Sequence, residues 1–260
     1  MESSTRLIAF GCLFLIIAGW EALAPRRQLR LSRWQRWPAN LALSVVNILG
    51  IRLLLASAAV GAALWAEQAN IGLFHMLNWP LWLEYVLCFA LLDLSIYWQH
   101  RLFHVIPLLW RMHRVHHADL DLDVSSGVRF HPLEGLLSML GKMAVIVALG
   151  IAPSLVLIFE LVLNLCATFN HGNIYISPRV DRYLRYILVT PDFHRIHHST
   201  ELTESQKNYG FSVPWWDYLF GSYLPEAQRN QTDMELGLAE TQTPAAAQSF
   251  SAAFVKLVLR

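Results

Sequence analysis

The sequence predicts an all-α integral membrane protein with about four transmembrane helices, counted as three spans plus a short helical hairpin, and a cytoplasmic helical cap. Three observations predict this fold. The chain of 260 residues is 55% hydrophobic and 15% charged, which is too apolar for an ordinary soluble domain. Apolar segments of membrane-spanning length recur along it, and arginines gather in the connections expected on one side. We therefore expect residues 1–260 to form a single membrane-embedded domain.

The first three transmembrane helices are predicted at 7–24, 41–65 and 80–98. The first segment also has features of a signal peptide, because Ala22-Leu23-Ala24 is similar to a small-residue cleavage site. Pro25 directly after that site and the acidic Glu2 before the apolar core favour a retained helix instead.

The fourth apolar segment, 136–169, predicts a short membrane hairpin. It is 34 residues long, whereas two full crossings need about 40 residues. The Gly150-Ile151-Ala152-Pro153 break divides it into two short halves. Either the halves are two short spans or they dip into the membrane and return. Both arrangements bring the chain back to the side that it left.

Arginine positions predict which side faces the cytoplasm. Five arginines lie within 26–36, whereas 66–79 contains neither lysine nor arginine. Because cytoplasmic connections are enriched in these residues, we expect 26–36 to be cytoplasmic and 66–79 to be external. The same reasoning places 99–135 and 170–225 on the cytoplasmic side, where they form the predicted cap. We expect 226–260 to be a loose tail, and the net charge of +1 gives no reason to expect a nucleic-acid partner.

Eight of the eleven histidines fall in three clusters within or next to the predicted cap: His100 and His104; His113, His116 and His117; His194, His197 and His198. Spacings of three and four residues place side chains on one face of a helix, and imidazole is the commonest metal ligand in proteins. Interfacial histidines at a helix end, or a basic surface helix, are the simpler interpretations. The recurrence of His-Arg-Val-His-His as His-Arg-Ile-His-His favours a metal site.

Counting ligands predicts two metal ions. A zinc site closes with four ligands, so eight imidazoles exceed one site, and imidazole alone does not distinguish zinc, copper, iron and nickel. His131 and His171 flank the predicted hairpin and are further candidate ligands, although a lone histidine is more often structural. His75 lies in the predicted external connection and is excluded.

Carboxylates near the clusters are candidates for orienting the metal ligands, since metal-bound histidines usually donate their second N–H to an acceptor. We expect this of Asp93, an acid within a predicted span, and of Glu134 and Asp192. Helix capping or interfacial charge is the alternative. No catalytic residue beyond the metal ligands is predicted. The absence of a Gly-x-Gly-x-x-Gly fingerprint indicates that electrons come from a separate redox protein.

These motifs resemble those of the fatty acid hydroxylase/sterol desaturase superfamily, in particular bacterial sterol-desaturase-like proteins. The resemblance extends from about Asp93 to Tyr223. It includes Arg-Phe-His-Pro-Leu-Glu at 129–134, Asn-His-Gly-Asn at 170–173 and Asp-Phe-His-Arg-Ile-His-His at 192–198. Some relatives have a second histidine a few residues after the equivalent of His171, where this chain has Asn173, Ile174 and Tyr175.

The resemblance implies a membrane di-iron oxygenase in the bacterial inner membrane, with its site on the cytoplasmic side. It implies that the eight clustered histidines, with His131 and His171, hold two iron ions, for which zinc can substitute in recombinant protein. Such an enzyme uses O₂ and external electrons to hydroxylate or desaturate a lipid or sterol-like substrate. A metal transporter or sensor and a zinc-dependent membrane hydrolase are the alternatives. Clustering of the histidines at one membrane face and the absence of His-Glu-x-x-His disfavour them.

Overall fold

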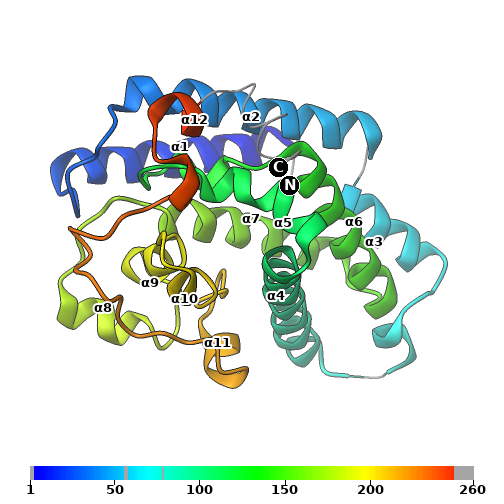
Figure 1. Ribbon diagram of the computed structural model, residues 1–260. Coiled ribbons are helices and arrows are strands. Elements are labelled where there is room, and N and C mark those ends of the chain that lie inside the picture. Colours follow the sequence, from blue (N-terminus) through cyan, green and yellow to red (C-terminus); the bar gives the residue numbers. More distant parts are fainter. Residues whose placement is uncertain (1–2, 56–57, 78, 249–260) are drawn as a thin grey trace.

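The computed structural model describes residues 3–55, 58–77 and 79–248, and these residues are almost entirely helix and connecting loop (Figure 1). They contain no β-strand, and the extended pairing among them is limited to two isolated β-bridges, Pro25 with Ile174 and Ser199 with Leu236. The all-α prediction is therefore confirmed.

Six helices make up the framework: α1 (Ser3–Leu23), α2 (Arg33–Leu54), α3 (Ala58–Gln68), α4 (Leu81–Val105), α6 (Pro132–Leu149) and α7 (Pro153–Asn170). Further helices carry much of the cap: α5 (Pro107–His117), α8 (Pro178–Leu184), α9 (Pro191–His197), α10 (Leu202–Ser205), α11 (Trp215–Leu219) and α12 (Pro244–Gln248). Three 3₁₀ turns, η1 (Leu73–Met76), η2 (Ser126–Val128) and η3 (Ala239–Thr241), complete the described elements.

Four segments are long and apolar enough to cross a membrane: Arg33–Met76, Leu81–Val105, Pro132–Leu149 and Pro153–Asn170. The segment predicted at 7–24 lies in α1, whose apolar part, Ile8–Leu23, is shorter than these four. The segment predicted at 41–65 begins inside α2 and ends inside α3. Outward-facing residues such as Leu53 and Trp82 are exposed, as expected of helices that contact lipid rather than water.

Proline and glycine set the ends of the two helices of the predicted hairpin. Pro132 and Pro153 occupy the first turns of α6 and α7, where the missing N–H costs no helical hydrogen bond. Gly150 ends α6 with a left-handed φ of 72°, a conformation that glycine adopts without strain. Each helix has 18 residues and is thus about 27 Å long, close to the roughly 30 Å of a hydrocarbon core.

The apolar core lies where α3, α4, α6 and α7 pack against one another. Its fully buried members include Ala63, Leu92, Ile146 and Val156, one from each helix. Helix α4 crosses the direction of α1 and α2 (Figure 1), and α6 packs against α2 as well as α4. This arrangement brings the C-terminal end of α4 and the start of α6 to the cap.

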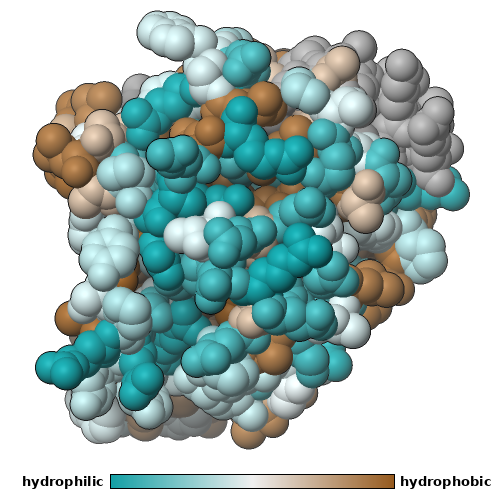
Figure 2. All heavy atoms as spheres, turned by 60° about the vertical axis from the view of Figure 1, so that its left-hand side comes forward, coloured by the Kyte–Doolittle hydropathy of each residue, from teal (hydrophilic) through white to brown (hydrophobic). Residues whose placement is uncertain are grey.

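The segment 226–248, expected to be loose, instead packs against the cap, so that prediction is wrong for these residues. Met234 and Leu236 are buried with Leu122, and the Gly237 N–H donates to the His198 carbonyl at 3.1 Å. The remainder of the predicted tail, 249–260, lies outside the described residues. The side of the molecule that carries α8 and α9 is largely hydrophilic, with apolar residues at its margins (Figure 2).

Candidate metal centre

The structure gathers nine histidines from four separate segments into one buried centre. The C-terminal end of α4 carries two, α5 three, α9 and its end three, and the residue that ends α7 is His171. They form two groups in which one ligand atom from each residue lies within 4.8 Å of every other. The five-histidine group is His100, His104, His113, His117 and His197; the four-histidine group is His116, His171, His194 and His198.

Each His-x-x-His-His unit divides its histidines between the two groups. In α5, His113 and His117 join the five-histidine group while His116 joins the other. In α9 the assignment is reversed, because His194 and His198 join the four-histidine group and His197 joins the five-histidine group. Residues i and i+4 stack on one helix face, whereas i+3 is rotated to the other side of that face. Each unit therefore serves both groups.

The two groups share a boundary. The rings of His117 and His198, one from each group, stack with their centroids 4.3 Å apart. The rings of His113 and His116 lie 5.4 Å apart. The centre is thus a pair of adjoining nitrogen pockets, an arrangement suited to two metal ions.

Several imidazole nitrogens face one another with lone pairs. The Nδ1 atoms of His100 and His197 lie 2.8 Å and 2.7 Å from the carbonyl oxygens of Tyr209 and Lys207. A carbonyl accepts, so these Nδ1 atoms must be the protonated nitrogens, and both Nε2 atoms carry lone pairs. Yet the two Nε2 atoms lie 3.0 Å apart. In a neutral pair this contact is repulsive, and a cation between the nitrogens relieves it.

The four-histidine group repeats this arrangement. Nδ1 of His116 donates to the Arg129 carbonyl at 3.1 Å, and Nδ1 of His171 donates to the Ala167 carbonyl at 2.7 Å. Their Nε2 atoms then face each other at 3.1 Å. Ligand nitrogens bound at about 2.1 Å are separated by about 3.0 Å in octahedral and about 3.4 Å in tetrahedral geometry. The observed spacing fits a shared metal ion.

Protonation of the imidazoles does not readily relieve the repulsion between the facing nitrogens. Burial lowers the pKa of His171 to about 4 and that of His197 to about 3. Burial and then neighbouring imidazoles hold the pKa of His116, His117, His194 and His198 well below the ordinary value. Neutral imidazole is the form that binds a metal ion. Nitrogens such as Nε2 of His113 and His117 have no hydrogen-bond partner among the described residues, so the residues fit two bound metal ions.

Of the three carboxylates expected to orient the ligands, Glu134 contacts a histidine. Its Oε1 lies 2.6 Å from Nδ1 of His113, which leaves Nε2 of that ring for the metal pocket. Asp192 instead pairs with Arg26 at 2.9 Å and with Arg195. Asp93 accepts a hydrogen bond from Trp216 Nε1 at 2.8 Å. These two acids brace the cap rather than the imidazoles.

The other acceptors for the imidazoles are backbone carbonyls, which sequence reasoning missed. The carbonyls of Tyr209 and Lys207 belong to the segment after α10, and that of Arg129 to the loop before α6. The Tyr209 ring also packs against His100, His104 and His197, with centroids 5.2–5.7 Å away. No side-chain pattern marks a carbonyl, so the sequence offered no signal beyond the Asn-Tyr-Gly segment at 208–210.

His131 lies outside both groups. It is the residue before α6, and its Nδ1 accepts a hydrogen bond from the Leu133 N–H at 3.2 Å. A helix leaves its first N–H groups without helical partners, and the His131 ring satisfies one of them. The geometry therefore gives this residue a capping position, in contrast to the ligand role expected from its sequence context. His75, which was not expected to bind metal, lies beside Gly150 at the other end of α6.

A buried polar network holds the loop between α5 and α6. Arg36 of α2 is fully buried and contacts Asp119 and Asp123 at 2.8 Å and 2.6 Å. Asn40 donates to Asp119 at 3.0 Å and accepts from Arg129 at 2.7 Å. Since the Arg129 carbonyl accepts from His116, the network fixes the backbone that orients one of the ligand imidazoles.

A cavity of about 230 Å³ lies beside the histidines, between α2, α4, α6 and α7. His100 and His113 of one group and His116 and His194 of the other line it. A ligand in this cavity would therefore contact both metal pockets.

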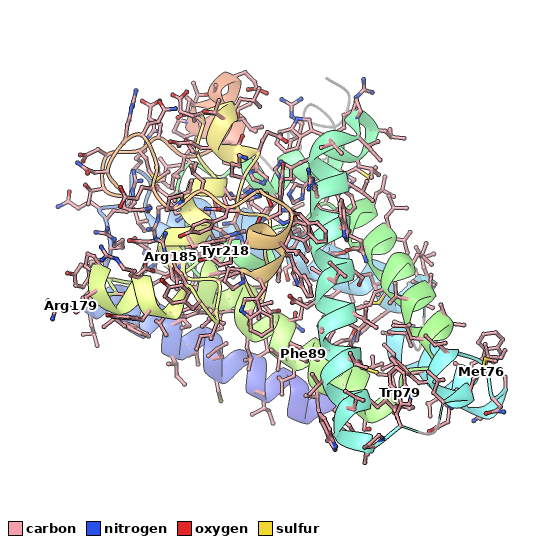
Figure 3. All side chains as sticks on the ribbon, turned by 90° about the horizontal axis from the view of Figure 1, so that it is seen from below. Met76, Trp79, Phe89, Arg179, Arg185 and Tyr218 are labelled. Carbon is pink, nitrogen blue, oxygen red and sulfur yellow. The ribbon has the colours of Figure 1, made fainter. Side chains whose placement is uncertain are left out.

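The two ends of the protein differ in the residues that they carry. Arg179, Arg185 and Tyr218 lie at one end, and Met76 and Trp79 lie at the other (Figure 3).

A family model described as fatty acid hydroxylase matches residues 85–222, more than half of the chain. The chain belongs to the fatty acid hydroxylase family. The matched region contains all nine histidines of the two groups. It also contains the cavity-lining residues of α4, α6 and α7.

Individual members of the family have modest sequence identity to the chain. The ornithine lipid hydroxylase of Rhizobium tropici is 27% identical over 249 residues, which cover 90% of this chain and 72% of that protein. Human alkylglycerol monooxygenase is 30% identical, over 62% of this chain and 35% of its own length. A putative Delta(7)-sterol-C5(6)-desaturase of Arabidopsis thaliana is 31% identical, over 59% of this chain and 53% of its own length. No solved structure gives a significant match.

Proposed function

We propose that the chain is a membrane di-iron oxygenase that uses O₂ and external electrons to hydroxylate, or to desaturate, a C–H bond of a lipid or sterol-like substrate. The main support for this proposal is the pair of imidazole groups, whose lone pairs face one another beside a shared cavity. The names of the relatives, which are lipid hydroxylases, monooxygenases and a desaturase, favour this reaction class over metal transport, metal sensing or zinc-dependent hydrolysis.

In this proposal the two histidine groups each hold one iron ion. Iron bound in the two groups would supply the reductive activation of O₂ that an unactivated C–H bond requires. Hydroxylation then converts C–H to C–OH, with one oxygen atom of O₂ leaving as water after taking up two electrons and two protons. Desaturation with the same electrons removes two hydrogens from the lipid and leaves two waters.

One side chain and several backbone carbonyls orient the imidazoles. Glu134 and the carbonyls of Tyr209, Lys207, Arg129 and Ala167 fix which ring nitrogen faces the metal pocket. Such outer contacts typically change metal affinity 10- to 100-fold. The cavity admits the substrate next to the imidazoles and away from bulk water, which limits side reactions.

We place the site on the cytoplasmic side of a bacterial inner membrane. The arginine-rich connection before α2 contacts the histidine-bearing α9, since Arg26 pairs with Asp192. Arg179 and Arg185 lie at the end of the molecule opposite to Met76 and Trp79 (Figure 3). This distribution agrees with the excess of arginine in cytoplasmic connections. We infer that a separate cytoplasmic redox protein delivers the electrons on this side.

The test is comparative lipidomics of host membranes that express the wild-type chain or its His197→Ala variant. We expect the wild-type chain to produce a lipid heavier by one oxygen, or one lighter by two hydrogens, and the variant to produce neither. His75→Ala is the matched control, because it removes a histidine at the far end of α6 and should leave the product unchanged. A wild-type chain that is folded and metal-loaded yet changes no lipid would contradict the proposed reaction.

A further inference from the structure

The cavity wall is largely apolar, with Ile96, Phe103 and Leu163 among its residues, and polar side chains from α2, α4, α6 and α7 interrupt it. They are Asn47 of α2, Gln99 of α4, Ser138 and Lys142 of α6 and Asn164 of α7. Glu134, Ser138 and Lys142 follow one another at intervals of four residues and so lie on one stripe of α6. The stripe begins at the acid that holds His113 and extends about 12 Å along the helix. Polar side chains that face a cavity disfavour a ligand that is hydrocarbon alone.

An ion pair lies at the far end of this stripe. Lys142 Nζ is 2.7 Å from Glu160 Oε1 of α7, and both residues are buried, each 7% exposed. The two helices are among the segments apolar enough to cross a membrane. Ionisable groups at such positions are expensive to bury, and they usually mark a functional site. An ammonium has three N–H donors, so the contact with Glu160 leaves Lys142 able to donate to a bound molecule.

Asn47 supplies a complementary acceptor. Its Oδ1 is buried and has no hydrogen-bond partner among the described residues. The side chain approaches α6 at Gly135, where an added Cβ would lie 2.0 Å from this oxygen. Glycine at this position therefore permits the close approach. A buried amide oxygen without a partner is destabilising, and a donor on a bound ligand would remove that cost.

We propose that this wall binds a neutral group of the lipid that both donates and accepts hydrogen bonds, a hydroxyl or a secondary amide. Asn47 Oδ1 would accept from the O–H or N–H of this group, and Lys142, seven residues beyond Gly135 on the same face of α6, would donate to an oxygen of the lipid. A carboxylate or phosphate fits less well, because Glu160 already neutralises Lys142. The inference rests on the proposed function and adds a position to it: the carbon that reacts lies within about 12 Å of this polar group, the length of the stripe along α6.

The test compares two probes that differ in one hydroxyl, hexadecan-1-ol and hexadecane. Each is titrated into the purified, metal-loaded full chain in lipid nanodiscs, and the apparent Kd is obtained from the rise in thermal midpoint. We expect the wild-type chain to bind the alcohol at least several-fold more tightly. Asn47→Ala should weaken alcohol binding roughly 2- to 10-fold, the range for one lost hydrogen bond, and leave hexadecane binding unchanged.

Two further variants make the result decisive. Lys142→Met combined with Glu160→Gln removes both charges together, so that neither is left buried without its partner, and it should also abolish the preference for the alcohol. Ser95→Ala removes a hydroxyl from α4 that donates to the Leu92 carbonyl and does not line the cavity, so it should preserve the preference. Equal binding of the two probes by a wild-type chain that holds two metal ions would overturn this inference while leaving the proposed function intact. A chain without metal would overturn the proposed function itself.

Discussion

At the scale of single residues, the decisive feature is the choice of tautomer. A backbone carbonyl or a carboxylate contacts Nδ1 in five of the nine imidazoles, which turns Nε2 of each toward the centre. Facing lone pairs at 3.0–3.1 Å then follow from the fold. These imidazoles are positioned for metal ions rather than for one another.

Substitution of His131 distinguishes a helix-capping role from a role as a metal ligand. Replacement by alanine should lower the free energy of unfolding by about 0.5–2 kcal/mol, the usual effect of losing a helix cap. His131→Asn retains an acceptor and should restore most of this loss. Both variants should bind as much metal as the wild-type chain, measured by elemental analysis. Loss of about one metal ion in both variants would instead assign His131 to the ligands.

Sequence reasoning predicted most of the candidate site, for identifiable reasons. The eight clustered histidines and His171 are the nine that the structure brings together, because helical spacing and position in the chain constrain where they lie. The assignment of His116 and His197 to the groups opposite their neighbours was not predictable, since it depends on how α5 and α9 face each other. His131 precedes Pro132, and proline in the first turn of a helix is a signal that could have identified it as a cap.

At the scale of elements, α2 contributes more than a membrane segment. Arg36 supports the prediction of a cytoplasmic connection, but it is also the centre of the buried network with Asp119 and Asp123. Pairing with Arg36 holds the pKa of Asp119 well below its usual range despite burial. Neither contact could be predicted, because the partners are more than 80 positions apart in the sequence.

The network gives a prediction for the loop that α2 supports. Arg36→Leu removes the guanidinium that contacts two buried carboxylates and should destabilise the chain by about 3–5 kcal/mol. Arg30→Leu is the control, because Arg30 makes an exposed hydrogen bond with Gln242 and its loss should change stability by about 0.5 kcal/mol or less. Chemical unfolding in detergent measures both. Similar, small effects from the two substitutions would show that the network does not stabilise the loop.

At the scale of the whole molecule, the buried centre couples stability to pH. In the metal-free chain, burial keeps the imidazoles of the centre neutral, with a pKa of about 4 for His171 against the ordinary 6.5. The unfolded chain binds more protons than the folded chain between these values. Stability contributed by the neutral imidazoles is therefore present above pH 6.5 and lost as the pH falls toward 4. Burial raises the pKa of Asp217 to about 6, so protonation of this one carboxyl has the opposite effect and favours the folded chain as the pH falls.

This coupling predicts that the chelator-treated chain becomes steadily less stable on acidification from pH 6.5 to pH 4. Thermal midpoints measured across this interval test it, and the metal-loaded chain should also release its metal, since protons compete for the same nitrogens. A midpoint that stays constant or rises on acidification would contradict the account of buried neutral imidazoles.

The ratio of metal to protein in the purified full chain directly tests whether the two imidazole groups hold two metal ions. The two imidazole groups predict close to two metal ions per chain for the wild type, whether iron or a substitute such as zinc. His171→Ala combined with His198→Ala dismantles the four-histidine group alone and should reduce the ratio to about one. A wild-type ratio of one or zero, or a ratio of two in the double variant, would contradict the two-metal centre.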